Sequence, residues 1–352
     1  MERYVNEAVE LLKQLIATPS VSREEKEAAD VMEARMAAWG LQPRREGNNL
    51  WCVCPDYDDA RPTLLLNAHV DTVKPVSTWT RAPFTPVVEG DKLYGLGAND
   101  CGGGLVSLLQ VFRLLCQRAR TYNIIYLASA EEEVSGKDGI SRVLPLLPKI
   151  DVALVGEPTG MQPATAEKGL MVIDGYAHGQ SGHAARNEGV NAIYEALDDL
   201  VWLRDYRFRK ESELLGCTKM TVTVVEAGTQ HNVVPDLLHF IIDVRTNEYY
   251  QNEYLFEFLK KHMKKCELKA RSFRLHSSHI PNEHPLVQHC LQEGLTPFGS
   301  PTLSDQALMP FPSLKLGPGQ SARSHSADEY IKISEIAEAI ETYIRLLDGL
   351  NL

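Results

Sequence analysis

The sequence predicts an α/β protein with a mainly parallel sheet flanked by helices, interrupted by an inserted β-α-β-β-α-β (ferredoxin-like) domain. In the first 170 residues, apolar runs of strand length alternate with helical patterns. Between residues 171 and 275 the order changes to that of a split βαβ unit, and it changes back afterwards. We therefore expect one domain from residues 1–170 and 276–352, with residues 171–275 inserted into it.

The expected elements follow from periodicity and from breaking residues. Apolar positions spaced by three and four indicate helices, and short apolar or alternating runs indicate strands. Helices are expected at 5–16, 24–39, 105–115, 137–147, 190–208, 250–264, 284–294 and 333–348. Strands are expected at 49–54, 63–69, 92–96, 123–130, 151–155, 170–178, 219–226, 237–245, 266–273 and 313–316.

Composition excludes several classes of partner. The formal net charge of -11 argues against binding to a nucleic-acid backbone. The charged amino terminus is unlike a signal peptide, and no apolar run is long enough to span a membrane. Seven cysteines, an odd number scattered along the chain, indicate reduced thiols in a cytoplasmic protein.

The run 63–71 ends in a histidine and an aspartate two residues apart. Because strand side chains alternate faces, His69 and Asp71 can project from the same side at the carboxyl end of the strand. This spacing suits an imidazole bound to a metal and oriented by a carboxylate. A turn with a hydrogen-bonded histidine is the alternative. The metal interpretation is favoured because later apolar segments also end in acids: Asp100, Glu132, Glu133 and Glu157.

Asp100 lies in a glycine-rich stretch, residues 95–104, between a strand and a helix. Glycines allow a tight turn there, which would hold the carboxylate near the amino end of the helix. A phosphate-binding loop is a competing interpretation, but the spacing of both common phosphate motifs is missing.

Several carboxylates that converge on one sheet edge raise one another's pKa unless cations neutralise them. Two divalent metals would supply that charge, and histidine with carboxylates suits zinc in an open catalytic site. Two ions roughly 3.5–4 Å apart could activate a water and polarise a carbonyl. One carboxylate would stay off the metals as a general base.

Six ordered motifs carry a resemblance to a known family. The chain resembles the acetylornithine deacetylase, succinyl-diaminopimelate desuccinylase and glutamate carboxypeptidase family of di-zinc amidohydrolases over nearly its whole length. The motifs are residues 69–73, Trp79 with Pro83-Phe84, residues 94–100 with the glycines that follow, residues 131–133, residues 156–159 and residues 325–330.

The resemblance implies a catalytic domain that binds two divalent ions, expected to be zinc, with cobalt or manganese as alternatives. It implies that His69 and Glu157 belong to one metal, that Asp100 bridges both, and that Glu133 and His325 complete the other. It also implies that the inserted domain serves as a lid or dimerisation domain in a homodimer.

The reaction would use further residues of the same motifs. The resemblance implies that Glu132 is the general base, that Asp71 orients His69, and that Glu131 is a solvated loop acid. His183, in the segment 179–185, resembles a histidine that helps to hold the substrate carbonyl oxygen and can be lent across a dimer interface. A surface histidine before a helix is the alternative.

Substrate contacts are less well defined. Arg245 is a candidate clamp for a substrate carboxylate, since guanidinium presents paired donors, although lone arginines near strand ends are often solvated. Asn232, Lys168 and Gly319 lie in segments that also resemble the family, and Lys168 could meet a succinyl tail.

The implied activity is hydrolysis of the amide of an N-acyl-L-amino acid, with N-acetyl- or N-succinyl-L-ornithine of arginine biosynthesis as the expected small-molecule substrate. A dipeptidase, a carboxypeptidase, a succinyl-diaminopimelate desuccinylase and a non-catalytic binding protein remain alternatives. One departure from the family concerns Cys101, which stands where many relatives have Met or Lys. We expect it to be a packing residue beside the site, with metal ligation as the alternative.

Overall fold

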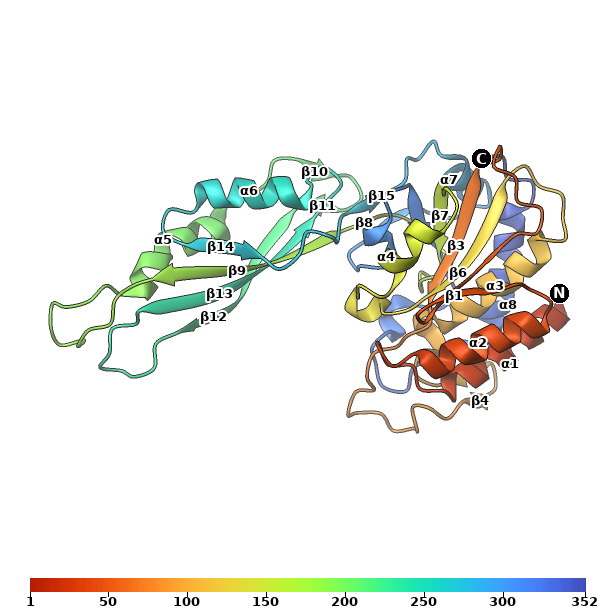
Figure 1. Cartoon of the computed structure of the whole chain (residues 1–352), viewed down its shortest axis with the longest axis horizontal. Helices are drawn as coiled ribbons and strands as arrows, with labels where there is room; N and C mark the ends of the chain where they lie inside the picture. The colour runs from red at the N-terminus through yellow and green to blue at the C-terminus, as the bar shows by residue number, and fades with distance from the viewer. The chain divides into compact units, whose positions relative to one another are not determined.

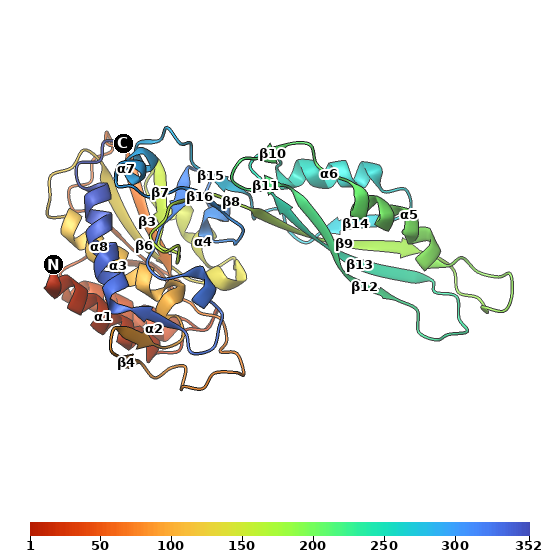
Figure 2. The same ribbon diagram turned by 180° about the vertical axis from the view of Figure 1, so that it is seen from behind.

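The computed structural model describes residues 1–352, which form two compact units. The large unit contains Met1–Thr165, His279–Phe298 and Ser304–Leu352. The small unit contains Ala166–Ser278 and Gly299–Leu303, and the predicted inserted segment falls within it. Figures 1 and 2 show the elements of each unit from opposite sides.

The main sheet belongs mostly to the large unit, and its central strands are parallel. In order, the strands are β1 (Arg44–Glu46), β2 (Asn49–Val53), β6 (Asn123–Ser129), β3 (Thr63–His69), β7 (Val152–Val155), β17 (Ser313–Lys315), β8 (Ala164–Glu167) and β15 (Ser278–His279), with β16 (Phe298–Ser300) beside β8. β6, β3, β7 and β17 run parallel, whereas β2 is antiparallel to β6. Every residue of β3, β6 and β7 is buried, as expected for strands covered on both faces.

Two hydrophobic clusters cover the two faces of this sheet. Leu64 and Leu66 of β3 pack with the helices α1 (Glu2–Ile16), α2 (Lys26–Ala38), α3 (Gly103–Leu115), α7 (Pro285–Gln292) and α8 (Ile333–Leu347). Leu65, on the opposite face, packs with the short helix α4 (Ile140–Val143). The alternation of faces along β3 therefore separates the two layers.

The helix expected at 137–147 is wrong in length. Regular helix covers only Ile140–Val143 and is followed by a single 3-10 turn, Leu144–Leu146. Pro145 lies in that turn, and its ring removes the backbone N–H that a longer α-helix would use.

A small sheet is formed by β4 (Val87–Glu89), β5 (Lys92–Tyr94) and β18 (Tyr330–Lys332), which have three residues each. Of these, only β5 was expected from the sequence. Tyr330 pairs with Tyr94, so the loop that carries His325 is tied to the segment that leads to Asp100.

The small unit has the connectivity β9 (Gly169–His178), α5 (Ala192–Asp205), β12 (Lys219–Ala227), β13 (Leu237–Thr246), α6 (Asn252–His262) and β14 (Glu267–Ala270). A short hairpin of β10 (Glu211–Ser212) and β11 (Gly216–Cys217) lies between α5 and β12. The sheet order is β12-β13-β9-β14, and all pairs are antiparallel. Buried side chains such as Met171 and Ile173 alternate along β9 and pack against the helices.

None of the helices is both long and apolar enough to cross a bilayer. All seven cysteines are free thiols.

Candidate metal centre

The predicted metal ligands of the large unit converge at one edge of the main sheet. His69 is the last residue of β3, Glu132 and Glu133 follow β6, and Glu157 follows β7. Because β3 is parallel to both neighbours, the carboxyl ends of all three strands meet at the same edge (Figure 1).

The imidazole of His69 is buried and faces carboxylates on one side. Its Nδ1 lies 2.9 Å from the backbone carbonyl of Asp71, which accepts a hydrogen bond from this nitrogen. Nε2 lies 3.2 Å from an oxygen of Asp100, 3.6 Å from Glu157 and 3.8 Å from Glu132. Burial lowers the pKa of His69, but Cys101, Asp100 and Asp71 outweigh it and raise the pKa well above its ordinary value. A metal ion bound at Nε2 would take the place of the proton that these neighbours favour.

A second group of ligands lies on the other side of Asp100. His325 Nε2 is 2.9 Å from Glu133 Oε2 and 3.6 Å from Asp100 Oδ2, whereas Oδ1 of the same aspartate faces His69. The two oxygens of Asp100 therefore face two different histidines, which is the arrangement that a bridging carboxylate requires. His69, Glu132 and Glu133 also form a compact group.

The carboxylates at this sheet edge repel one another, and this repulsion makes the cluster suitable for divalent cations. Oε1 of Glu157 is buried without a hydrogen-bond partner. Burial, together with the charge of Asp100, raises the pKa of Glu157 to about 8. Burial and the charge of Glu157 raise the pKa of Glu132 well above its ordinary value. A cation placed among these groups would relieve the repulsion and give the orphaned oxygen a partner.

Asp71, which the sequence predicts only to orient His69, also holds the backbone of Glu132 and Glu133. Besides lying beside His69, its carboxylate accepts hydrogen bonds from the backbone N–H groups of Glu132 and Glu133, at 3.0 and 3.2 Å. The hydroxyl of Ser22 donates to it as well, at 2.7 Å. Burial alone would raise the pKa of Asp71, but His69 and these donors lower it. One carboxylate therefore positions both the predicted base and a predicted ligand.

Glu329 is a positioning residue whose role the sequence did not reveal. Its buried carboxylate accepts backbone hydrogen bonds from Gly97 at 3.0 Å and from Asn99 and Asp100 at 2.8 Å each. These bonds fix the turn that carries Asp100, the predicted bridging ligand. Glu329 belongs to the motif at residues 325–330. The sequence does not indicate that it binds the backbone N–H groups near Asp100, because these lie far away along the chain.

Gly319 lies in the large unit and has a positive φ of +83°. A Cβ at this position would lie 2.2 Å from Oδ1 of Asn99, so the close approach requires glycine. Its neighbour Gln320 donates its backbone N–H to the same oxygen. The predicted role of Gly319 in substrate binding stays a prediction.

The remaining predicted site residues belong to the small unit. His183 is exposed, and the backbone of Asn232 accepts a hydrogen bond that holds the neighbouring loop. Arg245 donates to both carboxylate oxygens of Asp243, at 2.8 and 3.1 Å, so it already has an anionic partner. Lys168 is buried, and burial lowers its pKa. Their roles toward a substrate stay predictions.

Residues 65–349 match peptidase family M20/M25/M40. The chain belongs to this family. It is 28% identical to an acetylornithine deacetylase of Proteus mirabilis (strain HI4320), covering 98% of this chain and 97% of the relative. It is 29% identical to an acetylornithine deacetylase of Klebsiella pneumoniae (strain 342), covering 92% of each chain.

Solved M20-type structures share the fold. Aminopeptidase PepT from Bacillus cereus has a TM-score of 0.78 at 18% identity, covering 97% of this chain and 98% of that one. The Bacillus subtilis YXEP protein, described as a dinuclear metal binding peptidase, has a TM-score of 0.75 at 16% identity, covering 99% and 98%. Family membership makes this M20 protein a metal-dependent hydrolase of amide bonds, as predicted.

Proposed function

We propose that this M20 enzyme hydrolyses the amide of an N-acyl-L-amino acid, with N-acetyl- or N-succinyl-L-ornithine as the preferred class of substrate. The observation that carries the chemistry is the largely shielded carboxyl of Glu132, placed beside two groups of potential metal ligands that share Asp100. The substrate class is supported by the relatives named acetylornithine deacetylase, which match along nearly the whole chain.

One site would be formed by His69, Asp100 and Glu157, and the other by Asp100, Glu133 and His325. Divalent ions held there, with zinc preferred on the basis of the donors, supply Lewis acidity to an amide carbonyl and lower the pKa of water. The shared carboxylate sets the spacing of the two sites.

Glu132 acts as the proton carrier in this proposal. Bound cations would favour its ionised form, which can take a proton from the attacking water and give it to the leaving amine. The backbone N–H of Glu132 is held by Asp71, which limits how far the side chain can move from that position.

His183 is proposed to donate to the developing oxyanion of the substrate carbonyl. It is exposed in the small unit, and a homodimer in which one chain lends it to the other is the proposed working form. Arg245 would have to exchange Asp243 for a substrate carboxylate, and Lys168 would have to give up its hydrogen bond to the carbonyl of Cys217.

The test is turnover of a substrate panel by the metal-loaded protein. N-acetyl-L-ornithine, N-succinyl-L-ornithine, N-acetyl-L-lysine, N-succinyl-diaminopimelate and a set of dipeptides would be compared by kcat/KM. The proposal expects an N-acyl-ornithine to lead the ranking. A ranking led by dipeptides would replace the proposed substrate class with that of a dipeptidase.

A further inference from the structure

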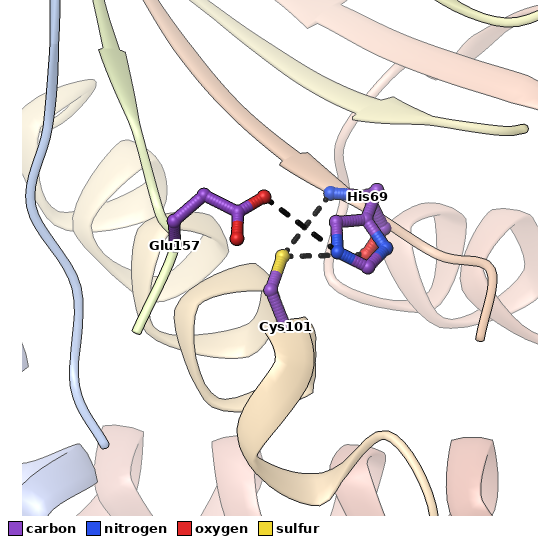
Figure 3. A group of neighbouring side chains, drawn as sticks. All are labelled: His69, Cys101 and Glu157. Carbon is purple, nitrogen blue, oxygen red and sulfur yellow. Dashed lines mark hydrogen bonds and ion pairs between the residues drawn. The ribbon is translucent and has the colours of Figure 1, made fainter. Parts of the chain in front are cut away.

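Cys101 lies next to the bridging aspartate and inside the metal centre. Its side chain is completely buried, and its sulfur, a ring nitrogen of His69 and a carboxylate oxygen of Glu157 all lie within 4.8 Å of one another. Figure 3 shows the three side chains pointing toward a common point from three different elements. The sequence predicts a packing residue at this position, with metal ligation as the alternative, and the geometry favours metal ligation.

The spacing suits ligands of a single ion. Zinc binds sulfur at about 2.3 Å and imidazole nitrogen or carboxylate oxygen at about 2.0–2.2 Å, so two such ligands are separated by no more than about 4.4 Å. His69 Nε2 and Glu157 Oε1 are already 3.6 Å apart. The sulfur lies within 4.8 Å of both atoms, so an adjustment of the side chains would bring it into the same coordination sphere.

The hydrogen bonds of Cys101 also match those of a coordinated thiolate. The backbone N–H of His69 donates to the sulfur at 3.3 Å, so the sulfur is held as an acceptor. The thiol's own contact with the carbonyl of His69 is long, at 3.7 Å, and is easily given up. Metal binding would replace the S–H bond by a metal–sulfur bond and release the proton to solvent, while the N–H donor would remain.

We propose that Cys101 is a ligand of the ion held by His69, Asp100 and Glu157, and that it biases this site toward thiophilic ions. A soft sulfur donor favours zinc or cadmium over manganese or magnesium, which prefer oxygen. The inference rests on the proposed metal-dependent function, and it adds a donor that differs in kind from the histidine and carboxylate set.

X-ray absorption at the zinc edge of the fully loaded protein tests this directly. A sulfur neighbour at about 2.3 Å is expected in the wild type and in C52S, and it is expected to be absent in C101S. Cys52 is the matched control, because it is a buried cysteine of the large unit outside the metal groups. A wild-type spectrum with only nitrogen and oxygen neighbours would overturn the inference, even if C101S does not fold.

Competition between ions gives a second readout. C101S is expected to weaken cadmium binding relative to manganese by at least about tenfold, the least that a change beside a metal usually costs. An unchanged ratio would contradict a sulfur ligand. If the wild type has normal zinc content and turnover but no zinc–sulfur signal, only the proposed role of Cys101 is wrong. If the wild type binds no metal, the proposed function itself is wrong.

Discussion

Both compact units place a histidine beside partly buried acids, but the two clusters balance their charge differently. In the small unit, Asp174 accepts hydrogen bonds from two guanidinium nitrogens of Arg271 and lies 2.9 Å from His239, and these partners lower its pKa. In the large unit, His69 and Lys315 oppose the repulsion at Glu157, yet its pKa remains about 8. The cluster of the small unit is therefore neutralised by side chains of the chain itself, whereas the cluster of the large unit keeps an excess of negative charge that bound cations would neutralise.

The largest expected effect comes from removing the proton carrier of the large unit. E132Q should lower kcat by about 10²–10⁴-fold, because proton transfer contributes that much, while the metal content stays normal. Kinetics and metal analysis of the same sample check this. E131Q is the matched control and should remain close to wild type. Normal turnover by E132Q would show that another group is the base.

Substitution of Glu329 should weaken metal binding indirectly, because this residue holds the turn at Asp100 and is not itself a predicted ligand. A glutamine offers one acceptor oxygen in place of a carboxylate to three backbone N–H donors, so E329Q should loosen the turn at Asp100. We expect roughly a 10–100-fold loss of metal affinity, measured by competition with a chelating dye. E338Q, at an exposed position of α8, is the control. Equal affinities would mean that Asp100 holds its position without Glu329.

The pH dependence of stability should separate the two clusters. A carboxyl whose pKa is raised on folding binds more protons when folded, so the unfolding free energy falls as pH rises through the folded value. Glu157, at about 8, and His325, whose pKa is raised to about 9 chiefly by Glu133, act in the same direction. The Tm of the metal-free protein should therefore fall between pH 6 and 9, and bound zinc should flatten the slope.

Differential scanning calorimetry of wild type and E157Q checks this prediction. The variant should show a shallower slope in the metal-free form. A Tm of the metal-free wild type that is constant or rises over this pH range would contradict the charge imbalance.

The smallest effect is expected in the small unit. R271A removes the guanidinium partner of Asp174, and the arginine is half exposed, so the unfolding free energy should fall by only about 0.2–1 kcal/mol. Denaturant titration measures the change, and the metal content should not move. A loss of metal on R271A would show that the two clusters are linked.

The order of elements in the large unit could be predicted because each long strand or helix carries its own periodicity. β3, β6 and β7 are mostly apolar and buried along their whole length, and α8 has one apolar face, so local patterns were sufficient. The strands β4 and β18 have three residues each and gain their order from pairing with β5. Such tertiary pairing leaves little trace in the sequence of a short segment.

The residues of the candidate site also fall into those that local sequence patterns predict and those that they do not. His69, Asp100 and Glu157 could be predicted because each ends or follows a recognisable element in a known motif. Glu329 acts on backbone N–H groups more than 200 residues earlier, and Cys101 looks like a packing residue until its neighbours in space are known. Contacts of this kind depend on the folded chain and not on local spacing.

The most direct measurement is the metal content of purified, metal-replete protein by mass spectrometry, with H69A, H325A and the double variant alongside. We expect two divalent ions per chain in the wild type, fewer in each single variant, and nearly none in the double variant, with D174N unchanged. A wild type without metal, or a double variant that keeps both ions, would contradict the conclusion that this cluster is completed by cations from outside.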